Sequence, residues 1–404
     1  MASIVPFRAL RPVPPSAPRV AAVPYDVVTA DEAAALASGN PLSFLHVSRA
    51  EIDLPRDLGP YDDAVYQKAI ENFDRLKAAA PLVMEETPRL YVYRLRMGAH
   101  EQTGIAAGFS LDEYERDIIK KHERTRQDKE DDRTRHMLAL RAQTGPVLLT
   151  YRASAAIEAV VTKTITGEPL FDFSAEDEVQ HTIWVVAARD EQVVTEAFAQ
   201  IPALYIADGH HRAASAARVR AQLRGSAGAG EWDTVLAVAF PDVQTQILPY
   251  NRVVKDLGAF TPSTLVARLE EQFTVRPGPA TPERRGEVSM FVDGRWYTIA
   301  FGNPSSDLPP DRRLDVSRLQ ERVLAPVLGI GDVRTDKRID FVGGAHGIGK
   351  LEQLVRSEQA AVAFSLYPVS VDDLMQISDA GGIMPPKSTW FEPKLRDGLL
   401  THVI

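Results

Sequence analysis

Residues 203–224 read ALYIADGHHRAASAARVRAQLR, and this stretch contains the clearest structural signal in the chain. The short apolar run at 203–207 predicts a buried strand, and the segment at 213–224, rich in Ala, Arg and Leu, predicts a helix. Gly209 lies between them and can adopt backbone conformations that other residues rarely adopt, which predicts a sharp turn. A strand that turns directly into a helix leaves unpaired backbone N–H groups at the positive end of the helix dipole. The stretch therefore predicts an anion site at the carboxyl end of a strand.

The side chains of this turn fit a nucleotide phosphate. His210, His211 and Arg212 can bind phosphate oxygens, and Asp208 can hold a metal ion or a substrate hydroxyl. The structural alternative is that Asp208 caps the helix and that the two histidines are partly buried polar residues. We favour the binding interpretation, because packing gives no reason for five such residues to be adjacent.

The composition narrows the classes of protein to consider. The chain has 404 residues, of which 45% are hydrophobic and 25% charged, as in an ordinary globular protein of two or three domains. Its net charge of −9 argues against a general nucleic-acid-binding protein, and the absence of cysteine excludes disulfides and thiolate metal sites. The N-terminus lacks the pattern of a secretory signal, and no apolar run approaches the roughly 20 residues that cross a bilayer. We therefore expect a cytoplasmic protein that binds neither nucleic acid nor membrane.

A second candidate region is the charged segment at residues 115–141. Residues 116–141 contain nine Lys or Arg and six Asp or Glu, a local charge of +3 in an acidic chain. Such a segment is often a solvated helix face, but here the i,i+4 pairs are mixed. The favourable pairs are Arg124–Asp128 and Arg126–Glu130, and the unfavourable pairs are Asp128–Asp132 and Lys129–Arg133. Helical pairing alone does not explain this pattern, and convergence of the charges on a polyphosphate and its Mg²⁺ is the alternative.

Other segments of the sequence predict a domain boundary, a helix, a hairpin and a glycine-rich turn. Residues 225–230 have the Gly, Ser and Ala composition of a flexible linker and predict a domain boundary. Apolar residues at helical spacing predict a helix over 61–80, and alternation around Asp293-Gly294 predicts a hairpin over 288–301. Residues 344–350 match the first seven places of a phosphate loop. Leu351 follows where a Mg²⁺-binding Ser or Thr is required, so we favour a simple connection to a helix.

The C-terminal region contains a proline-rich segment, residues 381–395, that predicts a rigid loop. Lys387, Ser388 and Thr389 in this loop could complete an anion or substrate site. Alternatively, Trp390 and the adjacent phenylalanine staple a structural tail to the protein.

Several motifs, taken together, resemble those of a widespread microbial family of unknown function. The resemblance extends over essentially the whole chain, and Asn251 stands where the family prefers His. The motifs are Pro6-Phe7-Arg8, Pro24-Tyr25-Asp26-Val27, Asn40-Pro41, Ser43-Phe44-Leu45-His46, residues 120–126, residues 129–133, residues 208–212 and residues 384–389.

The turn at residues 208–212 also resembles the one in free serine kinases of the ParB/sulfiredoxin-like group. That resemblance implies a ParB-like fold, nucleotide phosphates held by the turn, and phosphoryl transfer to the hydroxyl of a small molecule, with L-serine the leading candidate. It is local, so only Asp208 to Arg212 can be carried over. The catalytic base of those kinases is a carboxylate elsewhere in the chain, which this resemblance does not align.

We therefore predict a mixed α/β protein with a ParB-like nucleotide-binding catalytic region at 1–229 and a second α/β region at 230–404. The predicted activity is a Mg²⁺-dependent phosphotransferase that uses ATP or ADP and acts on a small hydroxyl compound such as L-serine. One alternative is a nucleotide-responsive switch protein without catalysis, and another is a metal-dependent hydrolase with His210 and His211 as ligands. The predicted catalytic residues are Asp208, His211 and, as general base, Glu123; the metal ligands are Asp208 and Asp132; and the phosphate-binding residues are Gly209, His210, Arg212, Lys121, Arg124, Arg126, Lys129, Arg133, Lys387, Ser388 and Thr389.

Overall fold

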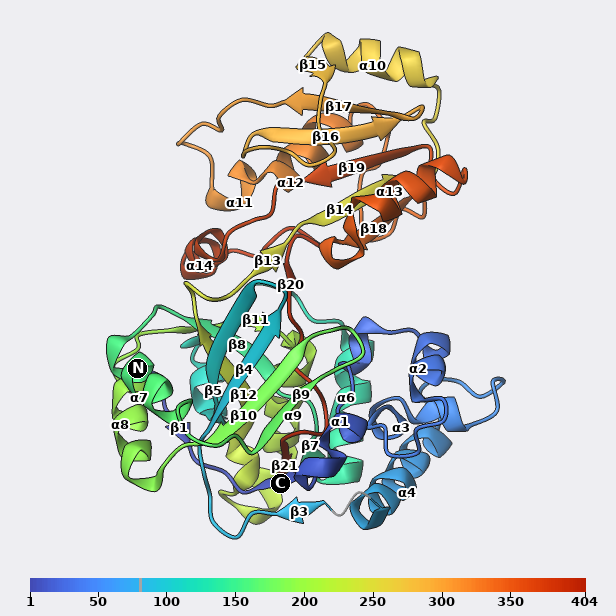
Figure 1. Cartoon of the computed structure of the whole chain (residues 1–404). Helices are drawn as coiled ribbons and strands as arrows, with labels where there is room; N and C mark the ends of the chain where they lie inside the picture. The colour runs from blue at the N-terminus through green and yellow to red at the C-terminus, as the bar shows by residue number, and fades with distance from the viewer. Residues whose placement is uncertain (80–81) are drawn as a thin grey trace. The chain divides into compact units, whose positions relative to one another are not determined.

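The computed structural model describes residues 1–79 and 82–404, and these form two compact units (Figure 1). The first unit comprises Met1–Thr245 together with Pro393–Ile404, and the second unit comprises Gln246–Glu392. Helices and strands are mixed in each unit, which confirms the predicted α/β class. Among the residues described, no helix has both the length and the apolar character required to span a bilayer.

A nine-stranded sheet forms the centre of the first unit. Its strands follow the order β6-β11-β8-β12-β5-β4-β10-β9, and β1 pairs with β5. β11 is parallel to β6 and antiparallel to β8, whereas β8 is parallel to β12, so the sheet is mixed. The strands are β1 (Ile4–Val5), β4 (Tyr91–Met97), β5 (His100–Ser110), β6 (Ile119–Lys120), β8 (Val147–Tyr151), β9 (Phe171–Ser174), β10 (Gln180–Val185), β11 (Leu204–Asp208) and β12 (Thr234–Pro241).

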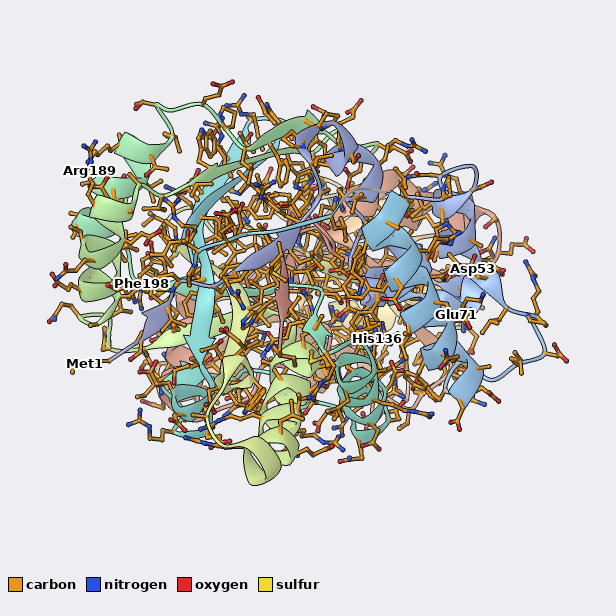
Figure 2. The ribbon with its side chains drawn as sticks, turned by 90° about the horizontal axis from the view of Figure 1, so that it is seen from below. Met1, Asp53, Glu71, His136, Arg189 and Phe198 are labelled. Atoms are coloured by element: carbon orange, nitrogen blue, oxygen red, sulfur yellow. The ribbon has the colours of Figure 1, made fainter. Side chains whose placement is uncertain are left out.

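Helices pack around this sheet. They are α1 (Ala17–Val20), α2 (Ala30–Ala37), α3 (Leu45–Ser48), α4 (Asp63–Ala79), α5 (Leu111–Glu115), α6 (Gln127–Leu140), α7 (Ala155–Thr164), α8 (Ala188–Phe198) and α9 (His210–Ala227). On α8, Phe198 packs in the interior while Arg189 lies at the periphery of the unit (Figure 2). The helix expected over 61–80 is α4, and residue 80 lies outside the described residues.

The junction of β11 and α9 is held by the core of the first unit. Ala213, Ala216 and Val219 on α9 are buried in the same hydrophobic cluster as Leu204 and Ile206 on β11. Their side chains are small or compact, so the helix can pack closely against the strand that precedes it. The sequence pattern at 203–224 thus gives the strand, turn and helix that it predicts.

A small sheet brings the two ends of the chain together. Its order is β3-β2-β21-β7, with β2 (Ala9–Arg11), β3 (Val83–Met84), β7 (Ala142–Gln143) and β21 (Thr401–Val403). β21 is antiparallel to β2, and Ala9 lies opposite His402. The last residues of the chain are therefore part of the first unit.

The second unit contains a six-stranded antiparallel sheet in the order β15-β17-β16-β19-β14-β18. The predicted hairpin is β16 and β17, which turn at Asp293-Gly294. The strands of the unit are β13 (Ile247–Leu248), β14 (Tyr250–Val254), β15 (Thr274–Pro277), β16 (Glu287–Val292), β17 (Arg295–Ala300), β18 (Ile339–Gly343), β19 (Val362–Leu366) and β20 (Trp390–Phe391). Its helices are α10 (Pro262–Glu270), α11 (Pro310–Arg313), α12 (Asp315–Leu319), α13 (Gly347–Arg356) and α14 (Val371–Asp379).

The division between the units differs from the boundary expected at residue 229. The Gly-rich residues 225–230 end α9, and Gly228 at its C-cap has a φ of 78°. The chain then enters β12, which pairs with both β5 and β8 inside the main sheet, so it cannot leave the first unit there. A glycine-rich helix end and a flexible linker have similar compositions, which explains the difference.

Candidate functional site

The predicted turn joins β11 directly to α9. Gly209 has a φ of 96° and a ψ of 31°, in the left-handed region that favours glycine. A Cβ atom at this position would lie 3.0 Å from the guanidinium carbon of Arg212, so both backbone and packing require glycine. Gly209 occupies the N-cap position of α9 and has no side chain with which to cap the helix. The first N–H groups of an α-helix have no acceptor within the helix and can bind an anion. The carboxylate of Asp208 has two described side-chain partners, Lys394 and Arg212.

Asp208 is held between these two cations. Its Oδ1 lies 3.1 Å from Nζ of Lys394, and its Oδ2 lies 2.6 Å from a terminal nitrogen of Arg212. Burial alone would raise the pKa of this carboxyl, but Lys394 and Arg212 hold the pKa well below its usual range. Asp208 is consequently a carboxylate at every physiological pH, with one oxygen on each cation.

Arg212 is buried and connects several segments of the first unit. Its guanidinium donates to the carbonyl of Pro146 and to Asp208, and it lies 4.0 Å from Asp26. Burial would lower its pKa, but the carboxylates of Asp26 and Asp208 raise the pKa above its ordinary value. The side chain is thus a fixed charge that positions two carboxylates.

The two adjacent imidazoles hold the segment 122–126, which has no regular secondary structure. Nε2 of His210 accepts the backbone N–H of His122 at 3.3 Å, and Nε2 of His211 accepts that of Arg126 at 3.1 Å. Nδ1 of His210 lies 3.8 Å from Oε2 of Glu123. The turn therefore brings Glu123 and Arg126 to the start of α9, as expected of a site built from both motifs.

His122 and His210 pack edge to face in the interior, with ring centroids 4.3 Å apart. Burial lowers the pKa of His122 to about 4 and lowers the pKa of His210 well below its usual value, so both rings are neutral at pH 7. With Glu123 they offer three potential metal-ligand atoms within 4.8 Å of one another. Nε2 of His210 already accepts a backbone N–H, so Nδ1 carries the ring proton of the neutral imidazole. The same holds for neutral His211, and this geometry does not favour a metal site on His210 and His211.

The charged segment forms ion pairs other than the i,i+4 pair Arg126–Glu130 considered from the sequence. Arg126 pairs with Asp128 at 2.6 Å rather than with Glu130, because α6 begins only at Gln127 and Arg126 precedes it. Glu130 accepts from Thr125 and pairs with Arg218 of α9 at 3.4 Å. Arg124 is exposed.

Two of the predicted phosphate-binding lysines point elsewhere. Nζ of Lys121 donates to the carbonyl of Tyr114 at 2.9 Å and lies 4.3 Å from the centre of the Tyr114 ring. Nζ of Lys129 lies 5.5 Å from the centre of the Tyr61 ring. Any contact of these lysines with a phosphate remains a prediction.

Asp132, one of the predicted metal ligands, lies on α6 in a buried polar cluster. It accepts from the hydroxyl of Tyr66 at 2.8 Å and pairs with Arg133 at 2.7 Å. The guanidinium of Arg133 in turn lies 4.2 Å from the centre of the Tyr25 ring. Asp132 and Arg133 thus neutralise each other, while Asp208 is neutralised by other cations.

Sequence reasoning missed the distant residues that complete this site. Asp26, on a 3-10 turn at Tyr25–Val27, lies beside Arg212. Lys394 and Asp397 come from the C-terminal segment, and Asp397 exchanges two backbone hydrogen bonds with Ala22, at 2.9 and 3.2 Å. Two of the three had a signal in the sequence: Asp26 belongs to a motif of the family resemblance, and Lys394 lies in the proline-rich segment 381–395. Asp397 had none.

Asp397 is a fully buried carboxyl, and its Oδ1 lies 2.4 Å from the position that a Cβ on Gly145 would occupy. Burial raises the pKa of Asp397 to about 7, although the positive charges of Arg212 and Arg133 oppose the shift. At neutral pH this carboxyl therefore exchanges a proton, which neither Asp208 nor the two buried imidazoles do.

Most of the predicted C-terminal loop, residues 381–392, lies in the second unit, and residues 393–395 belong to the first unit. Nζ of Lys387 lies 5.6 Å from the centre of the Tyr250 ring, and Ser388 is buried. Trp390 packs edge to face with Tyr250, with ring centroids 5.1 Å apart. These contacts support the interpretation in which aromatic side chains staple the loop, and a phosphate-binding role of Lys387, Ser388 and Thr389 remains a prediction.

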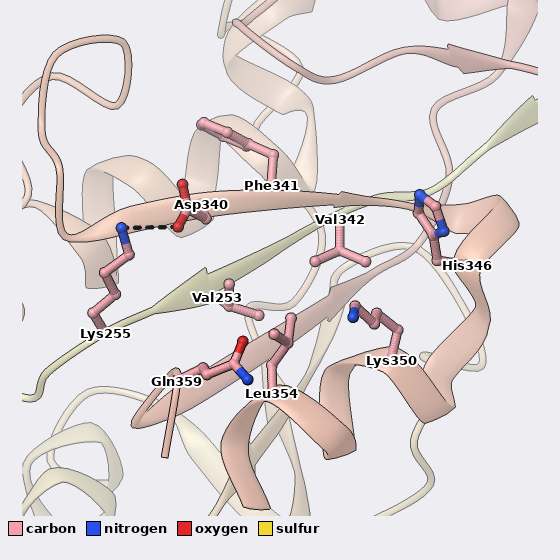
Figure 3. Close-up of a pocket in the computed structure, with 9 residues that line it drawn as sticks. All are labelled: Val253, Lys255, Asp340, Phe341, Val342, His346, Lys350, Leu354 and Gln359. Carbon is pink, nitrogen blue, oxygen red and sulfur yellow. Dashed lines mark ion pairs between the residues drawn. The ribbon is translucent and has the colours of Figure 1, made fainter. Parts of the chain in front are cut away.

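The glycine-rich segment at 344–350 is also in the second unit, where it follows β18 as a 3-10 turn, Gly344–His346, and continues into the start of α13. It borders an open cavity of about 470 Å³ (Figure 3). At one end of the cavity Lys255 pairs with Asp340 at 2.9 Å, and at the other end lie His346 and Lys350, both exposed. The turn joins a strand to a helix, as we favoured.

Comparison with known proteins identifies the family of the chain. The pattern of the family described as "Protein of unknown function (DUF1015)" matches residues 4–317. The chain belongs to this family. This confirms the resemblance that the motifs predicted, and no curated protein matches.

Solved structures give only distant likenesses. A variant of a free serine kinase in complex with ADP is 15% identical, with a TM-score of 0.35, over 73% of this chain and 92% of that chain. A conserved hypothetical protein from Pyrococcus furiosus is 15% identical, with a TM-score of 0.34, over 74% and 95% of the two chains. SbnI with a C-terminal truncation, from Staphylococcus aureus, is 14% identical, with a TM-score of 0.39, over 74% and 87%. TM-scores this low carry no argument about function.

Proposed function

We propose that the first unit binds the phosphates of ATP or ADP at the β11–α9 turn and transfers a phosphoryl group to the hydroxyl of a small molecule. The observation that carries this proposal is the N-terminus of α9, where Gly209 stands at the N-cap position and the charged groups of Asp208, Arg212 and Lys394 lie beside it. Backbone N–H groups at a helix N-terminus bind phosphate oxygens in many nucleotide sites. The resemblance of residues 208–212 to free serine kinases makes L-serine the first acceptor to test.

The catalytic roles follow from exposure and charge. Phosphoryl transfer depends mainly on positioning and on stabilising negative charge, and the amides of α9, His211 and Arg126 supply donors and positive charge. Glu123 has a side chain 57% exposed and lies at the start of α9, so it is our candidate for the general base that accepts the acceptor's hydroxyl proton. Arg212 is a positioning residue, because its guanidinium is buried among carboxylates.

The carboxylates at the turn fit a Mg²⁺ ion that arrives with the nucleotide. Mg²⁺ prefers oxygen ligands and is commonly held by one or two carboxylates together with substrate phosphates. Asp208 and Asp26 both lie beside Arg212, so we propose Asp26 rather than Asp132 as the second ligand. When bound, the ion would neutralise charge that develops on the phosphates.

Phosphorus NMR on the purified full chain tests the activity. With Mg²⁺-ATP or Mg²⁺-ADP, a new phosphomonoester signal should appear only when L-serine is present, and Asp208→Ala should abolish it. Glu123→Gln should preserve nucleotide binding and lower turnover, about 10²–10⁴-fold for loss of a general base. Glu270→Gln, an exposed glutamate at the end of α10, is the matched control and should leave turnover unchanged. Normal turnover in Glu123→Gln would remove Glu123 from the mechanism.

A nucleotide-responsive switch is the second candidate, and one observation favours it. The turn contacts the 122–126 segment, the Tyr25–Val27 turn and the C-terminal segment, so a ligand at α9 would reach all three. A nucleotide-induced rise in melting temperature without multiple turnover on any hydroxyl acceptor would establish this candidate instead. If neither a phosphomonoester signal nor a shift in melting temperature is observed, the turn is not a nucleotide site.

A further inference from the structure

The second unit contains an open cavity, beside β18 and α13, to which the proposed function gives no role (Figure 3). Its volume of about 470 Å³ lies within the range of about 300–1,000 Å³ that is typical of small-molecule sites. The residues that line it lie between Val253 and Gln359, so all of them belong to this unit. A molecule in the cavity would therefore be bound by the second unit alone.

Part of the cavity wall is apolar. Val253 of β14 and Val342 of β18 are buried in one hydrophobic cluster, and Leu354 of α13 packs against that cluster and is partly buried. All three residues also line the cavity, so part of their apolar surface faces any molecule that enters it. Apolar groups of such a molecule leave water when they contact this wall, which favours binding. The wall therefore fits a ligand with an apolar body.

The charged groups of the lining do not cancel. Among the described residues that line the cavity, Asp340 is the only carboxylate, and Nζ of Lys255 pairs with it at 2.9 Å. Lys350 lies at the other end with His346, and its side chain points from α13 toward the strands (Figure 3). Within the described part of the chain the ammonium of Lys350 makes no ion pair or hydrogen bond. Two lysines and one aspartate leave the lining with one net positive charge, which attracts an anion.

We propose that this cavity binds a small molecule that joins a carboxylate to an apolar body of several carbon atoms. The carboxylate lies at Lys350, and the apolar body lies against the valine and leucine side chains of the wall. A single negative charge balances the unpaired ammonium, whereas a doubly charged phosphate would bring excess negative charge toward Asp340. The site is independent of the turn at α9, and its ligand needs neither nucleotide nor Mg²⁺.

Octanoate is the probe, because it combines a carboxylate with an unbranched apolar chain. Its titration into the full chain, without nucleotide or Mg²⁺, is followed by NMR through the ring protons of His346, the only histidine among residues 246–392. The His346→Gln variant identifies these signals. They should shift on binding, and the affinity should rise from acetate through butanoate to octanoate, by up to about fourfold for each added CH₂. No shift at His346, or no gain with chain length, would overturn the inference.

Charge reversal tests the contact with Lys350. Lys350→Met should weaken octanoate binding about 2- to 5-fold, the effect expected of an exposed ion pair. Lys350→Glu should weaken it further and should bind octylammonium more tightly than the wild type does. A gain of affinity for the cation cannot come from a misfolded variant, so it separates a direct contact from structural damage. Equal octanoate affinity in the wild type and Lys350→Glu would overturn the inference.

The matched control is Arg295→Glu, which makes the same change of charge at an exposed residue. Arg295 lies on β17, which β16, β19 and β14 separate from β18 in the sheet. This variant should bind octanoate and octylammonium as the wild type does. If it copies the effects of Lys350→Glu, only the overall charge of the unit matters, and the cavity does not select the ligand.

Two further comparisons test the ligand class and the location. Octyl phosphate should bind the wild type no more tightly than octanoate, and tighter binding would mean that the cavity takes a phosphate instead of a carboxylate. Gln359→Trp places a large ring in the cavity from an exposed position, so it should abolish the octanoate-induced shift of His346. An unchanged shift in this variant would place the octanoate outside the cavity.

Discussion

The chain contains two junctions with the same local plan, one in each unit. In the first unit β11 leads through Gly209 into α9, and in the second unit β18 leads through a glycine-rich turn into α13. Each turn has a glycine with positive φ, 96° at Gly209 and 69° at Gly347, and neither helix has a side-chain cap. By local sequence the second junction is closer to a phosphate loop than the first.

Their surroundings are different. At the first junction His210 and Arg212 are buried, and distant segments bring Asp26, Lys394 and Asp397 to them. At the second junction His346 and Lys350 are exposed and border an open cavity. The comparison teaches that a glycine turn before a helix supplies only backbone donors. The charges that would make it a site come from tertiary structure, and only the first junction is enclosed by them.

The largest expected difference between the junctions is in the free energy of unfolding that is lost when one cation is removed. Arg212→Met leaves Asp208, whose side chain is 25% exposed, and the buried carboxyl of Asp397 without a buried positive charge, and breaking a buried pair costs up to about 3–5 kcal/mol. Lys255→Met removes the partner of Asp340, whose side chain is 61% exposed, and an exposed pair contributes about 1 kcal/mol or less. Chemical denaturation of the two variants measures both free energies of unfolding. Equal losses would show that the charges at the first junction are not structurally coupled.

A smaller difference in the free energy of unfolding is expected when a glycine of each junction, Gly209 or Gly349, is replaced by alanine. Gly209→Ala forces an alanine into the left-handed region and places its Cβ against Arg212, which should cost about 1–3 kcal/mol. Gly349→Ala in α13 meets open space in a helix, where alanine is favoured over glycine by about 0.5–1 kcal/mol. The two substitutions should therefore shift the melting temperature in opposite directions. A destabilising Gly349→Ala would mean that the second turn is more constrained than its open surroundings indicate.

The sequence predicted the parts of this site that lie within one local segment. The turn at 208–212, the strands around it and the family could all be predicted, because strand and helix periodicity and motifs are local signals. The contact of Lys394 with Asp208 could not, since 186 residues separate the two and no pattern links them. The charged segment was predicted in part: Glu123 reaches the turn through its carboxylate, 3.8 Å from His210, but Arg126 contacts His211 through its backbone N–H. Lys121 and Lys129 lie on tyrosine rings, which helical spacing does not reveal.

The smallest effect, measured over a single pH unit, concerns the proton on the buried carboxyl of Asp397. Burial raises the pKa of Asp397 to about 7, against an ordinary value of about 3.9 in the unfolded chain. Between these two values the folded state binds the proton that the unfolded state has lost, so this carboxyl makes the protein less stable as the pH rises from about 4 to 7. Asp397→Asn mimics the protonated form and removes this dependence.

The comparison of wild type with Asp397→Asn isolates this contribution from the other titrating groups. The free energy of unfolding of the variant, relative to the wild type, should increase with pH by at most about 1.4 kcal/mol per unit below pH 7 and level off above it. From pH 6 to 7 we expect this difference in the free energy of unfolding between the variant and the wild type to increase by about 1 kcal/mol, which denaturant unfolding at the two pH values can resolve. A difference that does not change over this interval would mean that Asp397 is already ionised in the folded protein. In that case Arg212, Arg133 and the other cations near Asp397 outweigh its burial, and the first junction has one more fixed negative charge.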